Sequence, residues 1–91
     1  MDDNVCVRNV TIRNAQGLHA RPADLFVKTA MTFASRVHVV KDNQRVDARS
    51  ILDLLTLAAV EGTLLTIEAT GPDAEQAAAA LVELVEQGFH E

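Results

Sequence analysis

The stretch Gly17–Phe33, which reads GLHARPADLFVKTAMTF, contains a turn and the helix face that decides the fold. The glycine at its start is typical of a turn, and the residues from Asp24 onward are typical of a helix. Apolar residues recur there at three- and four-residue spacing: Ala23, Phe26, Val27, Ala30 and Phe33. They form one stripe, which predicts a helix that buries a single face.

The segments around this helix alternate apolar and polar residues, as half-buried strands do. The alternation occurs at residues 10–13, 36–39 and 65–70. Asp42 and Asn43 tolerate a positive φ, so they predict a tight hairpin into a fourth strand at Arg45–Val46. The polar members of the strands are expected to face solvent: Thr11, Arg13, His38, Thr66 and Glu68.

Two further helices are expected. Ser50 is a favoured N-cap, and Asp53 lies in the first turn that follows, where the helix dipole favours an acid. Asp73 is the expected N-cap of the last helix, with Gln76 in the capping-box position and Gly88 as the terminator. The apolar stripe of that last helix comprises Ala77, Leu81, Leu84 and Val85.

The order of elements is therefore strand, helix, strand, strand, helix, strand, helix. Helices with one apolar stripe and strands with one apolar face predict two layers. The expected fold is α+β, an open-faced sandwich in which three helices cover one face of a four-stranded, mostly antiparallel sheet. No repeat or linker interrupts residues 1–91, so a single domain is expected.

Composition excludes several classes of function. The net charge of -5 and the small aromatic content, 3%, oppose non-specific nucleic-acid binding. Cys6 is the only cysteine, so an internal disulfide and a cysteine-built metal site are excluded. No secretory signal or membrane-spanning stretch is visible, which predicts a cytoplasmic protein that does not insert into a membrane.

His19 and Arg21 lie where the first helix begins. The first N–H groups of a helix have no intrahelical partner and favour an anion, and Pro22 fits this turn because it needs no donor there. An ordinary imidazole has a pKa of about 6.5, so it offers a neutral, nucleophilic nitrogen at neutral pH. A phosphoryl group on His19 would meet the helix N–H groups and the guanidinium of Arg21. The plainer alternatives are an exposed histidine beside a solvated arginine, or a passive anion site. The neighbouring sequence offers no carboxylate or second histidine placed to build a catalytic triad or a metal site.

Three segments carry a resemblance to a known family: GLHARPA at residues 17–23, RSILDLLTLA at residues 49–58, and the closing helix after Gly71. They resemble HPr, the histidine-containing phosphocarrier family of the bacterial phosphoenolpyruvate-dependent phosphotransferase system, over about residues 10–85. The resemblance implies that His19 accepts a phosphoryl group on Nδ1 from Enzyme I and passes it to an EIIA- or EIIB-type component. It implies that Arg21 neutralises the phosphoryl charge, that no cofactor or metal takes part, and that the protein is a carrier rather than a stand-alone catalyst.

The resemblance also implies a docking surface. Ile51, Leu52 and Leu55 match its apolar patch, and Lys28 and Arg49 match basic positions that meet acidic partners. The alternative for the apolar residues is core packing, but residues next to each other in a helix point about 100° apart. We expect Leu54 and Leu57 to be core and Leu52 to be exposed.

Ser50 matches the serine that HPr kinase/phosphorylase modifies in many relatives; the alternative is that it only caps its helix. Asp24 and Asp53 depart from the family pattern by placing carboxylates near the two candidate phosphorylation sites. Asp24 is expected to pair with Lys28 or Arg21. Asn43 and Ala58 stand where the family usually has glycine. Asparagine tolerates a positive φ, so the hairpin is expected to absorb its change, whereas the end of the short helix is expected to differ.

The sequence favours two functions over a small ligand-binding domain with a passive anion site. The first is a monomeric phosphocarrier that works with Enzyme I and EIIA-type proteins. The second is a regulatory module on the same scaffold, in which phosphorylation selects a partner protein rather than feeding sugar uptake.

Overall fold

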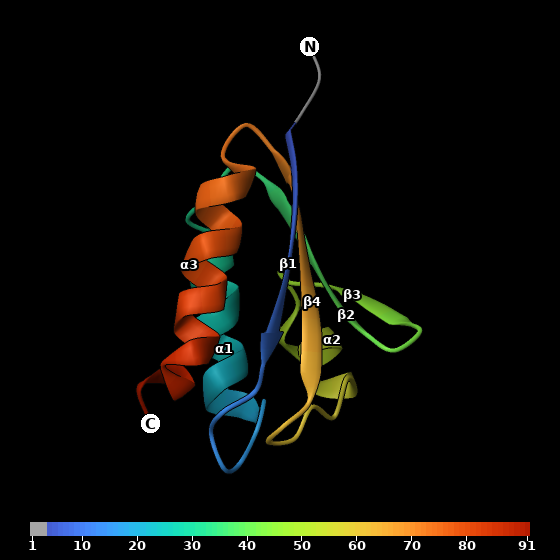
Figure 1. Cartoon of the computed structure of the whole chain (residues 1–91), viewed down its shortest axis with the longest axis vertical. Helices are drawn as coiled ribbons and strands as arrows, with labels where there is room; N and C mark the ends of the chain where they lie inside the picture. The colour runs from blue at the N-terminus through green and yellow to red at the C-terminus, as the bar shows by residue number, and fades with distance from the viewer. Residues whose placement is uncertain (1–3) are drawn as a thin grey trace.

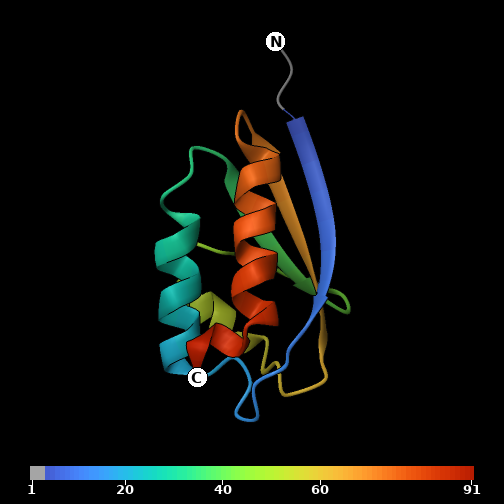
Figure 2. The same ribbon diagram turned by 60° about the vertical axis from the view of Figure 1, so that its left-hand side comes forward.

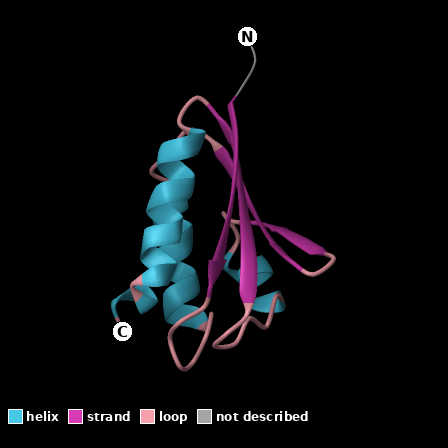
Figure 3. Cartoon of the chain, in the orientation of Figure 1, coloured by secondary structure: helices cyan, strands magenta, loops and turns pink. Residues whose placement is uncertain are grey.

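Four antiparallel strands form one open sheet in the computed structural model, which describes residues 4–91 (Figures 1 and 3). The strands are β1 (Asn4–Thr11), β2 (Arg36–Lys41), β3 (Gln44–Asp47) and β4 (Leu64–Gly71), in the spatial order β1-β4-β2-β3. Every pairing is antiparallel, and β4 lies in the centre, where Ile67 is paired with both Arg8 and Val39. The predicted strands are confirmed, although the first both begins and ends earlier than the alternation at residues 10–13 indicated, so that Ile12 and Arg13 lie outside it.

Three helices lie on one side of this sheet, as Figure 2 shows. They are α1 (Ala20–Ala30), α2 (Ile51–Thr56) and α3 (Ala74–Glu86), and a short 3-10 turn, Gly88–His90, follows α3. The two long helices lie side by side, and α2 packs against α1 and β3 at one end. The two-layer fold is therefore confirmed. In residues 4–91, no helix is both long and apolar enough to cross a membrane.

The core lies between the two layers. The inner sheet face contributes Val39, Leu65 and Ile67, and the helices contribute Phe26 and Leu81, all almost completely buried. Burial of one such large apolar side chain stabilises the fold by about 1.5–3 kcal/mol. The predicted stripes of α1 and α3 are buried at every position except Phe33, which lies beyond the end of α1 and is only partly buried.

The predicted capping box of α3 is wrong. Asp73 occupies the N-cap, but its side chain makes no capping hydrogen bond, and Gln76 is exposed. The carboxylate instead accepts hydrogen bonds from Ala34 N and Ser35 N, each at 2.9 Å. Donors brought in by the loop before β2 have outcompeted those of the helix itself.

The hairpin between β2 and β3 is confirmed, with one correction. Among the described residues, Asp42 adopts a positive φ of 54° and Asn43 does not. Of the two residues that could adopt a positive φ in this turn, only Asp42 does so. Aspartate and asparagine both reach the left-handed region more readily than most residues, because their short polar side chains can hydrogen-bond locally.

Two loops close the end of the sheet at which the candidate site residues lie. Ile12, just after β1, donates from its N–H to Thr63 O at 2.9 Å, and Gly62 N donates back to Ile12 O at 2.8 Å. These bonds join the segment that leads to α1 with the segment that leads to β4. The beginning of α1 is thus attached to the central strand of the sheet.

Candidate functional site

His19 is the N-cap residue of α1, with extended backbone angles of φ -85° and ψ -169°. Its carbonyl accepts the first helical hydrogen bond from Ala23 N at 2.9 Å, and its side chain makes no capping bond. The first N–H groups of a helix lack intrahelical partners, and Pro22 has none to leave unsatisfied. The backbone N–H groups of Ala20 and Arg21 therefore remain available to an anion beside the imidazole.

Gly17 sets the direction in which the chain enters this helix. Its φ is +70°, and a Cβ at this position would lie 2.3 Å from Ala59 O. The next residue, Leu18, is buried and donates from its N–H to the same carbonyl at 2.8 Å. The conformation and the close approach both require glycine.

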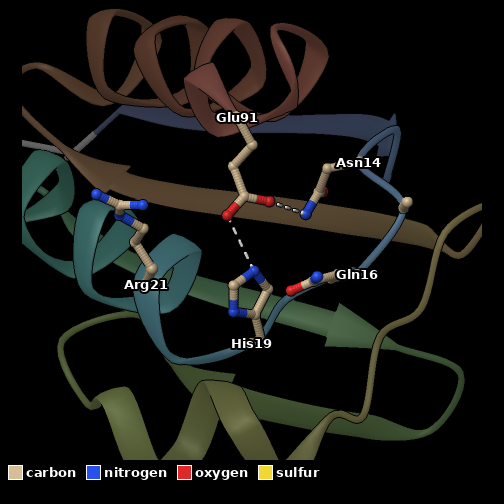
Figure 4. Close-up of a pocket in the computed structure, with 6 residues that line it drawn as sticks. Asn14, Gln16, His19, Arg21 and Glu91 are labelled. Carbon is tan, nitrogen blue, oxygen red and sulfur yellow. Dashed lines mark hydrogen bonds and ion pairs between the residues drawn. The ribbon is translucent and has the colours of Figure 1, made fainter.

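A carboxylate from the far end of the chain reaches the imidazole. His19 Nε2 lies 3.0 Å from Glu91 Oε2, although the two residues are 72 positions apart (Figure 4). Asn14 Nδ2 donates to the other oxygen, Glu91 Oε1, at 2.9 Å, and to Gly17 O at 2.7 Å. The sequence around His19 offers no carboxylate for the imidazole, but the folded chain does, because the packing of α3 brings Glu91 beside it.

These residues line a pocket of about 620 Å³, which is large enough for a phosphoryl group, together with Ala15, Gln16 and Arg21. Arg21 is exposed, and Figure 4 shows its guanidinium directed away from the His19 ring. Asp24 pairs with Lys28 at 3.0 Å, which is one of its two expected partners. Within residues 4–91 no ion pair joins Asp24 to Arg21, so the guanidinium remains free to turn toward an anion.

A second, more apolar hollow of about 290 Å³ lies on the other side of His19. Leu55 of α2 contributes to its wall, together with Leu18 and Val60. Ile51 and Leu52 are exposed on the same short helix, Leu52 to 75%, whereas Leu54 and Leu57 are buried. The prediction that separates core leucines from surface leucines is therefore confirmed, and an apolar surface continues from the imidazole onto α2.

The remaining predicted residues lie farther around the surface. Ser50 is the N-cap of α2, and its hydroxyl accepts a hydrogen bond from Asp53 N at 3.1 Å, which confirms its capping role. Arg49 is exposed and lines a small hollow with Arg36 and His38 rather than the pocket of His19. Lys28 is exposed near the C-terminal end of α1, where its ammonium group forms an ion pair with the carboxylate of Asp24.

Known proteins share both the sequence and the fold. Residues 6–87 match the family described as "PTS HPr component phosphorylation site". The chain is 40% identical over 84 residues to the phosphocarrier protein HPr of Neisseria meningitidis, covering 92% of this chain and 94% of that one. It is 41% identical over 80 residues to the HPr-like protein Crh of Bacillus subtilis, covering 88% and 94% of the two chains.

Two solved structures, both from Thermoanaerobacter tengcongensis, are also similar. The first, HPr-C-His, superimposes with a TM-score of 0.91 at 44% identity, over 94% of this chain and 97% of that one. The second, described as an HPr dimer, gives a TM-score of 0.76 at 46% identity, over 90% and 94% of the two chains.

Proposed function

The chain belongs to the HPr family of phosphocarrier proteins of the phosphotransferase system, and we propose that Nδ1 of His19 carries the phosphoryl group. The observation that supports this most directly is the place of His19 at the N-cap of α1, beside N–H groups that have no helical acceptor. Nε2 is engaged by Glu91, whereas Nδ1 makes no hydrogen bond to any residue in the described range 4–91. The free nitrogen is thus the one that a phosphoryl donor can approach.

The transfer itself is a displacement at phosphorus. The lone pair of Nδ1 of His19 forms the new N–P bond, while the bond between phosphorus and Enzyme I breaks and its electron pair stays on Enzyme I. The N–H groups of Ala20 and Arg21, with the guanidinium of Arg21, meet the phosphoryl oxygens. A second displacement then delivers the group to an EIIA-type protein: a nucleophile of that protein forms the new bond to phosphorus, while the N–P bond to His19 breaks and its electron pair returns to Nδ1.

The docking surface for these partners is proposed to be the apolar patch on α2 beside the imidazole. Leu52 is the most exposed member, Ile51 lies next to it, and Leu55 reaches the hollow that borders His19. Lys28 and Arg49 are exposed, and we propose that their positive charge attracts acidic partners, since surface charge guides association more than it adds affinity. Because Asp24 neutralises part of the charge of Lys28, this basic contribution is weaker than two free cations would give.

The test is labelling by phosphoenolpyruvate and Enzyme I. Wild type is expected to acquire an acid-labile phosphate, and His19→Ala to acquire none. Arg21→Ala is expected to slow transfer by roughly 10- to 100-fold, since it removes charge-assisted hydrogen bonds to the phosphoryl group. His38→Ala, a change on the open face of the sheet, is the matched control and should label as wild type does. Label that persists in His19→Ala would overturn the assignment.

Ser50 is proposed as a second, regulatory phosphorylation site. A phosphate there adds about -1.5 to -2 charges beside the docking patch, which repels acidic partners. The nearby carboxylate of Asp53 adds to that negative charge but also opposes the modification. Incubation with ATP and HPr kinase/phosphorylase should yield an acid-stable phosphopeptide that contains Ser50, and Ser50→Ala should yield none. If wild type also yields none, Ser50 is a helix cap only.

The second candidate is a regulatory module. The observation that favours it is the similarity to Crh, which is described in a solved structure as the catabolite repression HPr of Bacillus subtilis. His19 favours the carrier, since a purely regulatory protein does not need the nucleophile. Wild type that is labelled by Enzyme I but fails to pass the group to any EIIA-type protein would favour the regulatory role.

We also propose that the chain acts as a monomer in the cytoplasm, where phosphoenolpyruvate and Enzyme I are available to it. An open pocket and an exposed patch on α2 are compatible with a single chain that meets its partners in turn. Light scattering on the purified chain should give the mass of one copy, 9.8 kDa. A mass of two copies would instead match the related structure described as a dimer.

A further inference from the structure

Three residues form a hydrogen-bonded chain that ends on the imidazole. Asn14 is buried, and its side-chain nitrogen makes two bonds, one to Gly17 O at 2.7 Å and one to Glu91 Oε1 at 2.9 Å. The other oxygen of that carboxylate, Glu91 Oε2, lies 3.0 Å from His19 Nε2. Both carboxylate oxygens of Glu91 therefore have a partner, one of them the proposed phosphoryl carrier.

The backbone before Glu91 is held in an unfavourable conformation. Gly88, Phe89 and His90 have φ values of 64°, 57° and 62°, and the left-handed region costs a non-glycine residue about 1–2 kcal/mol. Phe89 is 1% exposed, so its burial in the core offsets part of this cost. Strain that packing maintains in this way is concentrated at functional sites, and here it directs the side chain of Glu91 toward His19.

The chemistry of the contact decides which nitrogen of His19 carries the proton. An ionised carboxylate only accepts hydrogen bonds, so Nε2 must donate, and the lone pair of the neutral ring then lies on Nδ1. The side chains of His19 and Glu91 are 35% and 25% exposed, so the contact is less screened by water than an ordinary surface pair.

We propose that Glu91 is a positioning residue for phosphoryl transfer, which keeps the proton of His19 on Nε2 and neutralises the charge that the ring acquires. This rests on the proposed function, in which Nδ1 of His19 carries the group. When the lone pair of Nδ1 forms the N–P bond, no proton leaves and the ring becomes cationic. When the group departs, the electron pair returns to Nδ1 and the proton remains on Nε2. The carboxylate stabilises the cationic ring in both directions.

The negative charge of Glu91 does not lie against the phosphoryl group. Figure 4 shows Nε2 directed toward Glu91 and Nδ1 on the opposite side of the ring. The phosphoryl oxygens on Nδ1 meet the N–H groups at the start of α1 and the guanidinium of Arg21 instead. Each charge of the phosphorylated imidazole thus has a separate partner.

The first measurement is the protonation of the unphosphorylated ring, followed by nitrogen-15 NMR at neutral pH. Wild type is expected to show Nε2 protonated and Nδ1 unprotonated. Glu91→Gln should keep this pattern, because its amide oxygen still accepts, whereas Glu91→Ala should shift both nitrogens toward a mixture of the two tautomers. Glu86→Gln, a change of an exposed carboxylate at the end of α3, is the matched control and should leave both signals unchanged.

The second measurement is the rate and equilibrium of transfer from phosphorylated Enzyme I. Glu91→Ala and Glu91→Gln should each lower the rate roughly 5- to 10-fold and shift the equilibrium toward phosphorylated Enzyme I by a similar factor, because both remove the charge. Glu86→Gln should match wild type.

If wild type is labelled on His19 but both Glu91 variants match wild type in rate and equilibrium, the role of Glu91 is wrong and the proposed function stands. If wild type takes no label on His19, the proposed function fails, whatever the NMR spectra show. Far-ultraviolet circular dichroism and thermal unfolding confirm that each variant is folded.

Discussion

Ala58 has a left-handed backbone, with a φ of 50°, directly after the C-cap of α2. Helices commonly end with glycine at this position, because a Cβ is unfavourable in the left-handed region. The substitution noted in the sequence therefore has a structural consequence: the chain makes the same turn and bears the strain. Position 17, by contrast, is still glycine, because a Cβ there would collide with the carbonyl oxygen of Ala59.

Ala58→Gly is expected to stabilise the protein by about 0.5–1 kcal/mol. Relief of a left-handed alanine is worth about 1–2 kcal/mol, from which the greater freedom of glycine in the unfolded chain subtracts roughly 0.4–1 kcal/mol. Thermal unfolding should show a higher Tm, by about 2–8 °C for a domain of this size.

The matched control for Ala58→Gly is Ala79→Gly, the same chemical change at an exposed position inside α3. It should lower stability by about 1 kcal/mol, because glycine is unfavourable in the interior of a helix. A decrease in Tm for both variants would contradict the strain at Ala58.

At the scale of elements, α2 depends on contacts at its two ends. It has six residues, too few for a helix that is stable in isolation. Ser50 caps its N-terminus, and Lys41 Nζ donates to Leu57 O at 2.8 Å near its C-terminus. Because buried Leu54 and these end contacts hold the helix in place, Leu52 on its outer face is free for partners.

Ser50→Ala is expected to cost about 1 kcal/mol, because the N–H of Asp53 loses its acceptor. Ser50→Asp should keep stability within about 0.5 kcal/mol of wild type, since aspartate caps helices as well as serine does. Denaturant unfolding checks both values. Equal destabilisation by the two variants would mean that an aspartate side chain does not replace the cap that the Ser50 hydroxyl provides.

At the scale of the whole molecule, Asp73 connects parts of the chain that lie 38 residues apart. Its carboxylate accepts from Ser35 Oγ at 2.5 Å and from the N–H groups of Ala34 and Ser35, so the start of α3 is joined to the loop that precedes β2. The hydrogen bond from the Ser35 hydroxyl, followed by that from Ala34 N, lowers the pKa of Asp73 below its ordinary value of 3.8.

This shift makes stability depend on pH in acid. Because the folded-state pKa of Asp73 is lower, the unfolded chain binds more protons between the two values, and stability rises with pH across that interval. The contribution is complete above about pH 4 and is lost as the pH falls through the folded-state pKa. Urea midpoints measured from pH 7 to pH 2 should fall below pH 4 in wild type and fall less steeply in Asp73→Asn, which has no carboxylate to protonate there.

Glu75→Gln, which removes an exposed carboxylate two residues away, is the control and should keep the wild-type slope. Parallel pH profiles for wild type and Asp73→Asn would contradict the role of this carboxylate.

The sequence by itself determined the elements, their order and the surface of α2. Periodicity is local, because the spacing of apolar residues reports which face of a helix or strand is buried whatever that face meets. For the same reason Leu54 and Leu57 could be separated from Leu52, and His19 could be placed at the beginning of a helix from the residues beside it.

Only the tertiary structure decided which distant groups became partners. Asp73 was predicted as a cap from its neighbours in sequence, but a serine hydroxyl and two N–H groups from another loop were better donors. Glu91 gave no signal of its relation to His19, since the two residues lie 72 positions apart and the chain between them must fold before their side chains meet. Local spacing can place a candidate nucleophile, whereas the charge that faces it depends on how the whole chain packs.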